Sequence, residues 1–448
     1  MSSKQRSSSE AAGLRLTYII GTYPSLTTTF IDREIIALRA AGVDVRVVSI
    51  RRTTGVLSAE QQALQEAVTY LLPVVWVRLL LSHMYFSLRH ARRYFATLCY
   101  LASRTHPTEQ ARWMTLLHFG EGVYAAYLIR NHACDALHAH FAERAATVTL
   151  VMSRLLGKPY SLSIHAGPDI FVQPVLVGEK IEHAAHVVTC THANQRQVES
   201  IVGPELGRKI ICVHHGLDLE RYQATPVNAI PQPVIVSVGQ LAERKGFAVL
   251  IAACRLLRDQ GYTFVCRIIG QGPLHGTLAT QIRQLGLEET VHLCGALPHE
   301  AVIEEYRCAT VFALACQRST DGDMDGLPNV LAEAMSMQLP VVSSAISAIP
   351  ELVEHEVSGL LVPPHDPAAL AAALGRLLDD ASLRDRLGKH ARRTVTERFD
   401  SKRNVARLAA LLWPDWFPSP PQPAKQMSVP PAPGYVAESM EYGMTADL

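Results

Sequence analysis

Short apolar runs alternate with amphipathic stretches along most of this chain. The first run, at residues 14–20 (LRLTYII), precedes a helical pattern over Thr29–Ala41, and a second run, VDVRVVSI, begins after Gly42. Apolar runs of this length separated by helices are typical of parallel strands that are buried on both faces. The same alternation resumes at residue 234. The pattern therefore predicts an α/β fold with two doubly wound, Rossmann-like domains.

A serine-rich start and two proline-rich stretches interrupt this alternation. With 448 residues the chain is also too long for a single hydrophobic core. Segments of such composition favour linkers and disorder over packed structure. The expected divisions are a disordered start over 1–13, a first domain over 14–223, a linker over 224–233, a second domain over 234–398, a closing helix within 399–416 and a disordered tail over 417–448.

The composition is that of an ordinary globular protein, with 48% hydrophobic and 19% charged residues. A net charge of +1 argues against a nucleic-acid binder that relies on bulk electrostatics. The nine cysteines include no C-x-x-C pair, which favours free thiols in a reducing compartment. The polar start lacks the apolar core of a signal peptide, and no uncharged apolar run reaches the ~18 residues of a spanning helix. We expect a cytoplasmic protein, with peripheral attachment to the inner face of the cell membrane left open.

The segment Ala67–Thr108 is basic, with five arginines and no acidic residue. A helical projection gives it two faces, one with Arg78, Ser82, Tyr85, Arg89 and Arg93 and another with Leu80, Met84, Leu88 and Phe95. A basic amphipathic segment of this kind can lie on an anionic membrane surface. A helix pair packed on the first domain, with its arginines in solvent, would give the same pattern. Both interpretations stay open.

The stretch Gln317–Leu339 (QRSTDGDMDGLPNVLAEAMSMQL) joins an acidic, glycine-broken loop to a helical pattern. Asp325 lies at the end of the loop, and Glu333 lies about two turns into the helix, since a helix repeats every ~3.6 residues. The backbone amides of Asn329 and Val330 fall in the opening turn, where they lack intrahelical partners and the helix dipole is positive. Phosphate binds readily at such an end. These features would suit a sugar attached to a diphosphate.

Several further candidates follow directly after predicted strands, where ligands bind in doubly wound sheets. They are Gly21 and Thr22 after the first strand, His165 after YSLSI, Gly239, Gln240, Arg244 and Lys245 after VIVSV, and Gly270 and Gly272 after FVCRII. Glycine lets the backbone approach a ligand closely, and a lysine in such a loop can pair with a phosphate. A lone histidine at such a place is more often structural, and the alternative for Lys245 is a solvated lysine. We expect neither Lys245 nor Glu333 to fill a core.

The motif DGLPNVLAE resembles the E-x(7)-E motif of retaining GT-B glycosyltransferases, with Asp325 in place of the first Glu. The opening YPSLTTTFIDREIIALRAAGVDVRVVSI is similar to that of exopolysaccharide glycosyltransferases of the colanic-acid type, with Thr28 where relatives carry Glu. Relatives also carry Arg where this chain has Gln240. The resemblance covers about residues 14–412.

This resemblance implies a GT-B fold, in which two Rossmann-like domains face each other across a cleft and the last helix crosses back to the first domain. It implies a retaining hexosyltransferase that moves a sugar from a nucleoside diphosphate sugar to an acceptor hydroxyl. The acceptor would be lipid-linked or an oligosaccharide, in exopolysaccharide or cell-surface glycan biosynthesis. No metal and no cofactor besides the donor substrate are expected.

The resemblance also implies roles for individual residues. His165 would contact the reacting sugar, Lys245 the diphosphate, Asp325 the hydroxyls of the donor sugar and Glu333 the ribose. The segment around Leu293 would border the base. The amides of Asn329 and Val330 would complete the phosphate site.

Two other functions remain open. A sugar-nucleotide epimerase of the same fold would bind the donor alike but need no acceptor. A non-catalytic binding subunit would explain the departures at Thr28, Gln240 and Asp325. The retained His165, Lys245 and Glu333 argue against it.

Overall fold

The computed structural model describes residues 13–25, 28–55, 57–165, 170, 174–223 and 232–417. The expected disordered start, most of the expected linker and nearly all of the expected tail lie outside these residues. The two residues that follow His165 lie outside them as well. Among the residues described, no helix combines the length and the apolar character needed to span a bilayer.

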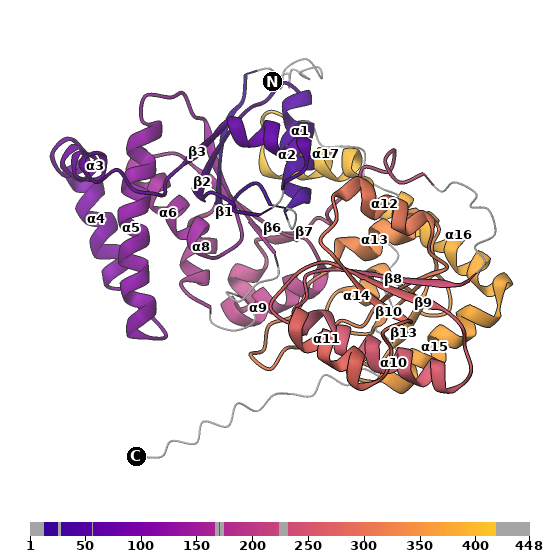
Figure 1. The fold of residues 1–448 in the computed structure, drawn as a ribbon. Helices are drawn as coiled ribbons and strands as arrows, with labels where there is room; N and C mark the ends of the chain where they lie inside the picture. The colour runs from indigo at the N-terminus through magenta and orange to yellow at the C-terminus, as the bar shows by residue number, and fades with distance from the viewer. Residues whose placement is uncertain are drawn as a thin grey trace, which may run out of the picture.

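A sheet of seven strands forms the centre of the N-terminal domain (Figure 1). Its order is β3-β2-β1-β4-β5-β6-β7, and all neighbouring strands are parallel. The strands are β1 (Arg15–Thr22), β2 (Asp44–Arg51), β3 (Val68–Tyr70), β4 (Ala136–His140), β5 (Tyr160–Ile164), β6 (His186–Thr189) and β7 (Ile210–Cys212). Every residue of β5 is buried, as expected for a parallel strand covered on both faces.

Helices connect these strands and cover the sheet. They are α1 (Thr29–Ala40), α2 (Ala59–Glu66), α3 (Trp76–Arg89), α4 (Ala91–Ala102), α5 (Glu109–Ile129), α6 (Arg144–Leu156), α8 (Val177–His183) and α9 (His192–Gly207). In Figure 1, α3, α4 and α5 lie together on the side of the sheet away from the C-terminal domain. We call these three helices the helical arm.

The C-terminal domain repeats this architecture around six parallel strands in the order β10-β9-β8-β11-β12-β13. The strands are β8 (Val234–Val238), β9 (Val265–Ile269), β10 (Val291–Gly295), β11 (Val311–Leu314), β12 (Val341–Ser344) and β13 (Leu360–Val362). The helices are η1 (Glu243–Lys245), α10 (Phe247–Asp259), α11 (His275–Gln284), α12 (His299–Arg307), α13 (Asn329–Ser336), α14 (Ile349–Leu352), α15 (Pro367–Asp379) and α16 (Ala381–Arg398). The two sheets confirm the predicted α/β fold with two Rossmann-like domains.

The last helix, α17 (Ser401–Leu412), packs on the N-terminal domain. Its Leu408 and Leu412 share a hydrophobic core with Leu16 of β1 and other residues near the chain start. Just before it, the N–H of Leu217 donates to the carbonyl of Phe399 at 2.7 Å, and the N–H of Ser401 donates to the carbonyl of Leu217 at 2.9 Å. The chain therefore crosses between the domains at residues 399–401.

A second contact between the domains is made by Glu351 of α14. Its carboxylate accepts hydrogen bonds from the backbone N–H groups of His192 (2.9 Å) and Ala193 (2.6 Å), at the start of α9. Nε2 of His214 lies 3.3 Å from the same carboxylate. Burial by itself would raise the pKa of Glu351, but the hydrogen bonds from His214 and the two N–H groups outweigh it and lower that pKa. The ionised group thus sits at the positive end of the α9 dipole.

Two glycines of the C-terminal domain are required by the backbone itself. Gly246 has a φ of 64°, and a Cβ there would lie 1.7 Å from the carbonyl oxygen of Ala315. Gly270 has a φ of 146°, and its Cβ would lie 1.8 Å from the carbonyl oxygen of Gly239. The sequence predicts that the glycines after β9 allow close approach of a ligand. The structure shows that Gly270 is needed for contact with the loop after β8.

Packing of α16 on the segment after α13 gives a test of this architecture. A Cβ at Gly388 would lie 2.1 Å from the carbonyl oxygen of Gln338. Gly388→Ala should therefore lower the free energy of unfolding by about 1–3 kcal/mol, although alanine in a helix normally stabilises by about 1 kcal/mol. Urea denaturation measures the change. Gly276→Ala in α11, where a Cβ meets nothing within 4 Å, is the matched control and should not destabilise. Equal loss in both variants would contradict the packing.

Candidate functional site

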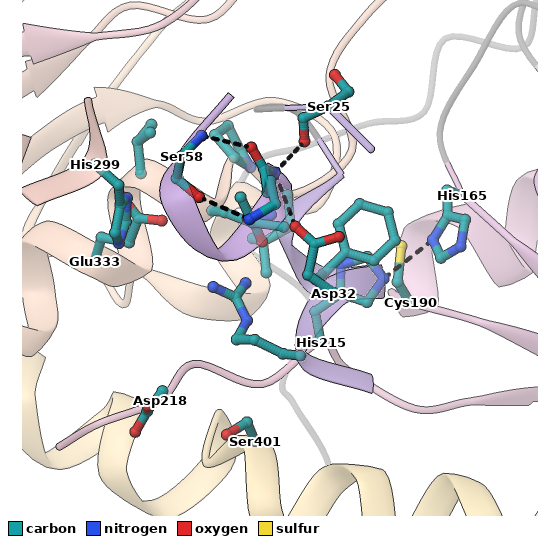
Figure 2. Close-up of a pocket in the computed structure, with 18 of the residues that line it drawn as sticks. Ser25, Asp32, Ser58, His165, Cys190, His215, Asp218, His299, Glu333 and Ser401 are labelled. Atoms are coloured by element: carbon teal, nitrogen blue, oxygen red, sulfur yellow. Dashed lines mark hydrogen bonds between the residues drawn. The ribbon is translucent and has the colours of Figure 1, made fainter. Parts of the chain in front are cut away.

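A cleft of about 1270 Å³ lies between the two domains and is lined by residues of both. Figure 2 shows His165, Cys190 and His215 of the N-terminal domain on one side and His299 and Glu333 of the C-terminal domain on the other. The carboxyl ends of the strands of both sheets face this cleft, which is where the fold places ligands.

Ten of the fourteen predicted site residues line the cleft. They are His165, Gly239, Gln240, Arg244, Lys245, Gly270, Asp325, Asn329, Val330 and Glu333.

The other four, Gly21, Thr22, Gly272 and Leu293, do not line it. Gly21 and Thr22 belong to β1 itself, so the loop that we predicted to begin at Gly21 starts later. Gly272 packs against the backbone of Leu241. A Cβ on Gly272 would lie 2.5 Å from the carbonyl oxygen of Leu241. Leu293 packs against the core of its domain. Donor binding by these four residues stays a prediction that their positions do not support.

The cationic side of the cleft is built from the short η1 helix and the loop before α13. Nζ of Lys245 lies 2.8 Å from Oδ2 of Asp325. Arg244 pairs through Nε with Oδ1 of Asp325 and through Nη1 with Oδ2 of Asp323, at 3.3 Å each. Burial alone would lower the pKa of Lys245, but Asp325 outweighs it and raises that pKa. Lys245 is therefore charged, and Asp323 is paired with Arg244.

Gln240, which stands where relatives carry Arg, also has a hydrogen-bond partner in the cleft. Nη2 of Arg244 donates to Oε1 of Gln240 at 2.7 Å, which leaves the side-chain NH₂ of Gln240 as a hydrogen-bond donor. In α13, no side chain caps the opening turn. The amides of Asn329 and Val330 thus face the cleft from the positive end of this helix.

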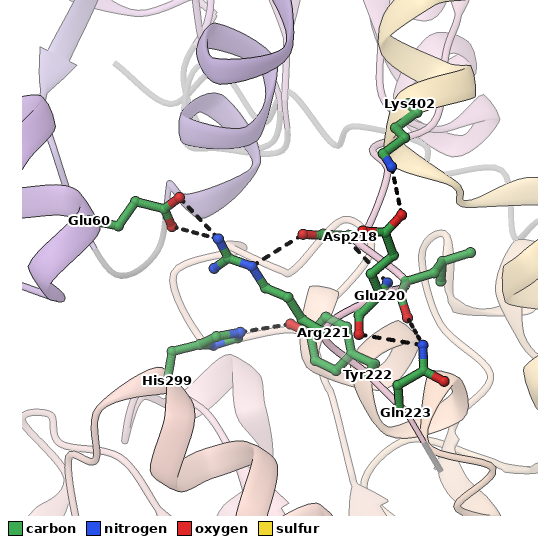
Figure 3. Close-up of polar contacts among 9 residues, drawn as sticks. Glu60, Asp218, Glu220, Arg221, Tyr222, Gln223, His299 and Lys402 are labelled. Atoms are coloured by element: carbon green, nitrogen blue, oxygen red, sulfur yellow. Dashed lines mark hydrogen bonds and ion pairs between the residues drawn. The ribbon is translucent and has the colours of Figure 1, made fainter. Parts of the chain in front are cut away.

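Glu333 is only 5% exposed and the Lys245 side chain is 12% exposed, although we expect neither to fill a core. Both line a deep cleft, which has little accessible surface without being a packed core. The hydroxyl of Tyr306 donates to Oε2 of Glu333 at 3.2 Å. Burial and the charge of Glu333 raise the pKa of Tyr306 well above its ordinary value, so this donor keeps its proton. Beside it, the hydroxyl of Tyr222 contacts Nε2 of His299 at 2.9 Å (Figure 3).

His165 belongs to a chain of histidines that the sequence did not predict. Nε2 of His165 lies 3.0 Å from Nδ1 of His140, and its Nδ1 lies 3.0 Å from Nε2 of His215. Phe30 stacks on His215 with ring centroids 4.0 Å apart. The sequence did hold a signal for this group of histidines, because each of them comes at or after the end of a strand. β4 ends at His140, β5 is followed by His165, and His215 follows β7. In the sequence alone, His140 is interpreted as mostly structural.

The chain of contacts selects the tautomers. Oε1 of Glu34 lies 3.5 Å from Nε2 of His140 and favours a proton on that nitrogen. Nδ1 of His140 then accepts, Nε2 of His165 donates to it, and Nδ1 of His165 accepts from His215. His165 is thereby held in one orientation at the cleft.

Two groups in the described part of the chain have metal-binding atoms within 4.8 Å of one another. They are His165 with Cys190 and His215, and Glu34 with His138 and His140. Both nitrogens of His165 already bond to histidines. The expectation of a metal-independent site stays a prediction.

Ion pairs close one edge of the cleft (Figure 3). Nη2 of Arg221 lies 3.0 Å from Oε1 of Glu60, and its Nε lies 3.2 Å from Oδ2 of Asp218. Lys402 pairs with Glu220 at 2.7 Å. Exposed ion pairs of this kind add little to the free energy of folding. They therefore form one edge of the cleft but contribute little to holding the two domains together.

Residues 222–394 match the family model of the group 1 glycosyl transferases. The chain is 41% identical over 250 residues to the amylovoran biosynthesis glycosyltransferase AmsK of Erwinia amylovora, covering 55% of this chain and 61% of that protein. It is 42% identical over 207 residues to the putative colanic acid biosynthesis glycosyltransferase WcaL of Escherichia coli, covering 46% of this chain and 51% of that protein. The chain thus matches about half to three fifths of the length of these relatives. The matches confirm the predicted resemblance.

Solved structures agree on the fold. Anabaena HepE in complex with UDP superposes with a TM-score of 0.64 at 16% identity, over 89% of this chain and 99% of that one. TarM superposes with a TM-score of 0.67 at 10% identity, over 90% and 100% of the two chains. The predicted GT-B fold is confirmed.

The histidine chain predicts a specific acid sensitivity. Burial lowers the pKa of His215 to about 3, below the value of about 6.5 in an unfolded chain. Between these values the unfolded state binds a proton that the folded state does not, so acidification lowers stability. In His215→Asn the pH dependence of the unfolding free energy should be shallower by about 1.4 kcal/mol per pH unit between pH 6 and 4.

Chemical denaturation at a series of pH values measures this slope. His390→Asn, at an exposed position of α16, is the control and should keep the slope of the parent protein. An unchanged slope in His215→Asn would show that His215 is protonated in the folded state.

Proposed function

We propose that this protein is a glycosyltransferase that moves a hexosyl group from a nucleoside diphosphate sugar to an acceptor hydroxyl, with retention of anomeric configuration. Its role would be in exopolysaccharide or cell-surface glycan biosynthesis, with a lipid-linked or oligosaccharide acceptor. The observation that carries the proposal is the cleft, in which Lys245 and the start of α13 face His165 of the other domain. Names of the relatives support the same chemistry.

Departure of the diphosphate is the step that the C-terminal domain would assist. Negative charge grows on the leaving oxygen when its bond to the anomeric carbon breaks. Lys245, already charged and held by Asp325, would stabilise that charge together with the amides of Asn329 and Val330. Glu333, oriented by Tyr306, would accept hydrogen bonds from ribose hydroxyls. Cations and amides that are fixed before the reaction need no reorganisation during it.

The N-terminal domain would hold the reacting sugar and admit the acceptor. His165, oriented by its two histidine neighbours, would contact the sugar from the face opposite Lys245. Retention requires the acceptor oxygen to arrive on the face from which the diphosphate leaves. The new bond joins that oxygen to the anomeric carbon, and the departing phosphate oxygen, on the same face, can take the hydroxyl proton. The products are then the glycoside and the nucleoside diphosphate.

Charge-removing variants test the assignment. Lys245→Ala and Glu333→Gln should each lower the rate of sugar transfer about a hundredfold, because a lost charge-stabilising contact costs on the order of 3 kcal/mol of barrier. Release of nucleoside diphosphate from a panel of UDP-, GDP- and ADP-sugars measures the rate. Lys389→Ala and Glu397→Gln, at exposed positions of α16, are the matched controls.

Two further readouts decide between the proposal and its alternatives. Proton NMR of the product should give the same anomeric configuration as the donor; inversion would refute retention. Both site variants transferring sugar at the parent rate would remove Lys245 and Glu333 from the reaction. Donor binding without any turnover would favour a binding subunit instead.

A further inference from the structure

The outer surface of the helical arm is unusually apolar. Eleven of the fifteen exposed large hydrophobic residues in the described part of the chain lie between Val75 and Leu117. They are Val75, Trp76, Val77, Leu80, Leu81, Met84, Leu88, Phe95, Trp113, Met114 and Leu117, which we call the arm face. Extended apolar surface of this kind marks a site of interaction with a membrane or another protein.

The orientation of α3 shows that this surface is not a by-product of folding. The residues of α3 that are buried are Ser82 and Phe86. Trp76, Leu80 and Leu88 are 76%, 63% and 79% exposed. A helix that packs on a soluble domain turns its apolar stripe inward, whereas α3 turns most of it outward. α3 does pack on the domain through Phe86, with its arginines in solvent, but it exposes apolar side chains beside them.

The neighbouring helix α5 also has apolar side chains on its exposed side. In α5, Ala111, Thr115 and Phe119 are buried, while Trp113 and Leu117 are 66% and 61% exposed. α3 packs directly against α5, so the two exposed rows lie on neighbouring helices.

Basic residues accompany the arm face. Arg78, Arg89 and Arg92 are exposed, and none of them is in an ion pair with a described residue. The other two arginines of the segment have partners inside the protein: Arg93 donates to the carbonyl of Leu155 at 3.2 Å, and Arg104 stacks on a tyrosine ring. The three unpaired arginines are thus the ones available to a ligand.

We propose that the arm face docks on the surface of an anionic lipid bilayer. Aliphatic side chains and the two tryptophans would enter the interface, where tryptophan is preferred, and Arg78, Arg89 and Arg92 would contact lipid phosphates. A second copy of the chain fits less well. Residues 67–108 contain no carboxylate, and Glu109, at the start of α5, already pairs with Arg112, so two arm faces in contact would bring together more arginines than counter-charges.

Docking of the arm would also hold the N-terminal side of the cleft at the bilayer. Phe86, Tyr94, Leu101 and Phe119 belong to the same buried cluster as β4 and β5, so the arm is fixed to the domain that holds His165. Of the two proposed acceptor classes, docking favours the lipid-linked one. That last step rests on the proposed function, whereas bilayer docking does not.

Vesicle sedimentation of the full chain tests docking. The protein should bind vesicles of phosphatidylcholine with 30% phosphatidylglycerol, more weakly in 500 mM than in 50 mM salt, because salt screens the arginines. Arg78→Gln, Arg89→Gln and Arg92→Gln together should weaken this binding about tenfold to a hundredfold. The control replaces three exposed arginines of the C-terminal domain, Arg283, Arg393 and Arg398, with Gln and should bind as the parent does.

The apolar part is tested separately. Trp76→Ser, Leu80→Ser and Leu88→Ser together should abolish binding at either salt concentration, while the exposed positions Ile211, Leu256 and Val357 changed to Ser serve as the control. Brominated lipid should quench tryptophan fluorescence in the parent protein and much less in Trp76→Phe with Trp113→Phe.

Three outcomes would overturn the proposal. They are parent protein that stays in the supernatant with anionic vesicles, serine variants that bind as the parent does, and a parent dimer in sedimentation velocity that the serine variants convert to monomer. The last would assign the arm face to a second copy. Sugar transfer to a soluble acceptor, measured alongside, should persist in all arm variants, so failure of docking and failure of the proposed function can be told apart.

Discussion

The buried carboxylate of Glu351 is the contact on which the geometry of the cleft depends. His165 stands on one sheet and Lys245 on the other, so their separation is set by how the domains meet. Glu351 accepts two backbone N–H groups at the start of α9 and contacts His214. Pulling the domains apart would leave that charge buried without partners, which is costly. The chain also crosses between the domains at residues 399–401, so the backbone limits how far the domains can separate at this interface.

Within the cleft so fixed, the two sides differ in charge. Lys245 and Arg244 are balanced by Asp325 and Asp323, while burial keeps His165 neutral by lowering its pKa. A donor diphosphate would therefore enter a site whose cations are already held in place and compete with carboxylates for them. Asp325 is one methylene shorter than the Glu of relatives, and this length favours direct pairing with Lys245. In the proposed reaction, the cations would then stabilise the leaving oxygen most when it gains charge, which is what catalysis needs.

The sequence predicted most of the fold, because strand and helix periodicity are local properties. It also placed ten site residues in the cleft, since strand order and strand ends follow from the doubly wound pattern. It failed where the answer depends on contacts distant in the chain. The packing contacts of Gly272 and Leu293 involve residues distant in the sequence, and the histidine chain at His140 and His215 needed strands that are adjacent only in space. Burial of Glu333 could not be anticipated, because a cleft is formed by both domains.

The helical arm shows the same limit most clearly. An amphipathic pattern has the same period whether its apolar side points inward or outward, so the residues of α3 alone could not decide between packing and docking. The folded arm is anchored by Phe86 and Tyr94, which are not part of the arm face. Stability and surface chemistry are thus carried by different side chains of one helix pair. Because of this separation, the arm face is free to serve a ligand without any cost to the fold that positions His165.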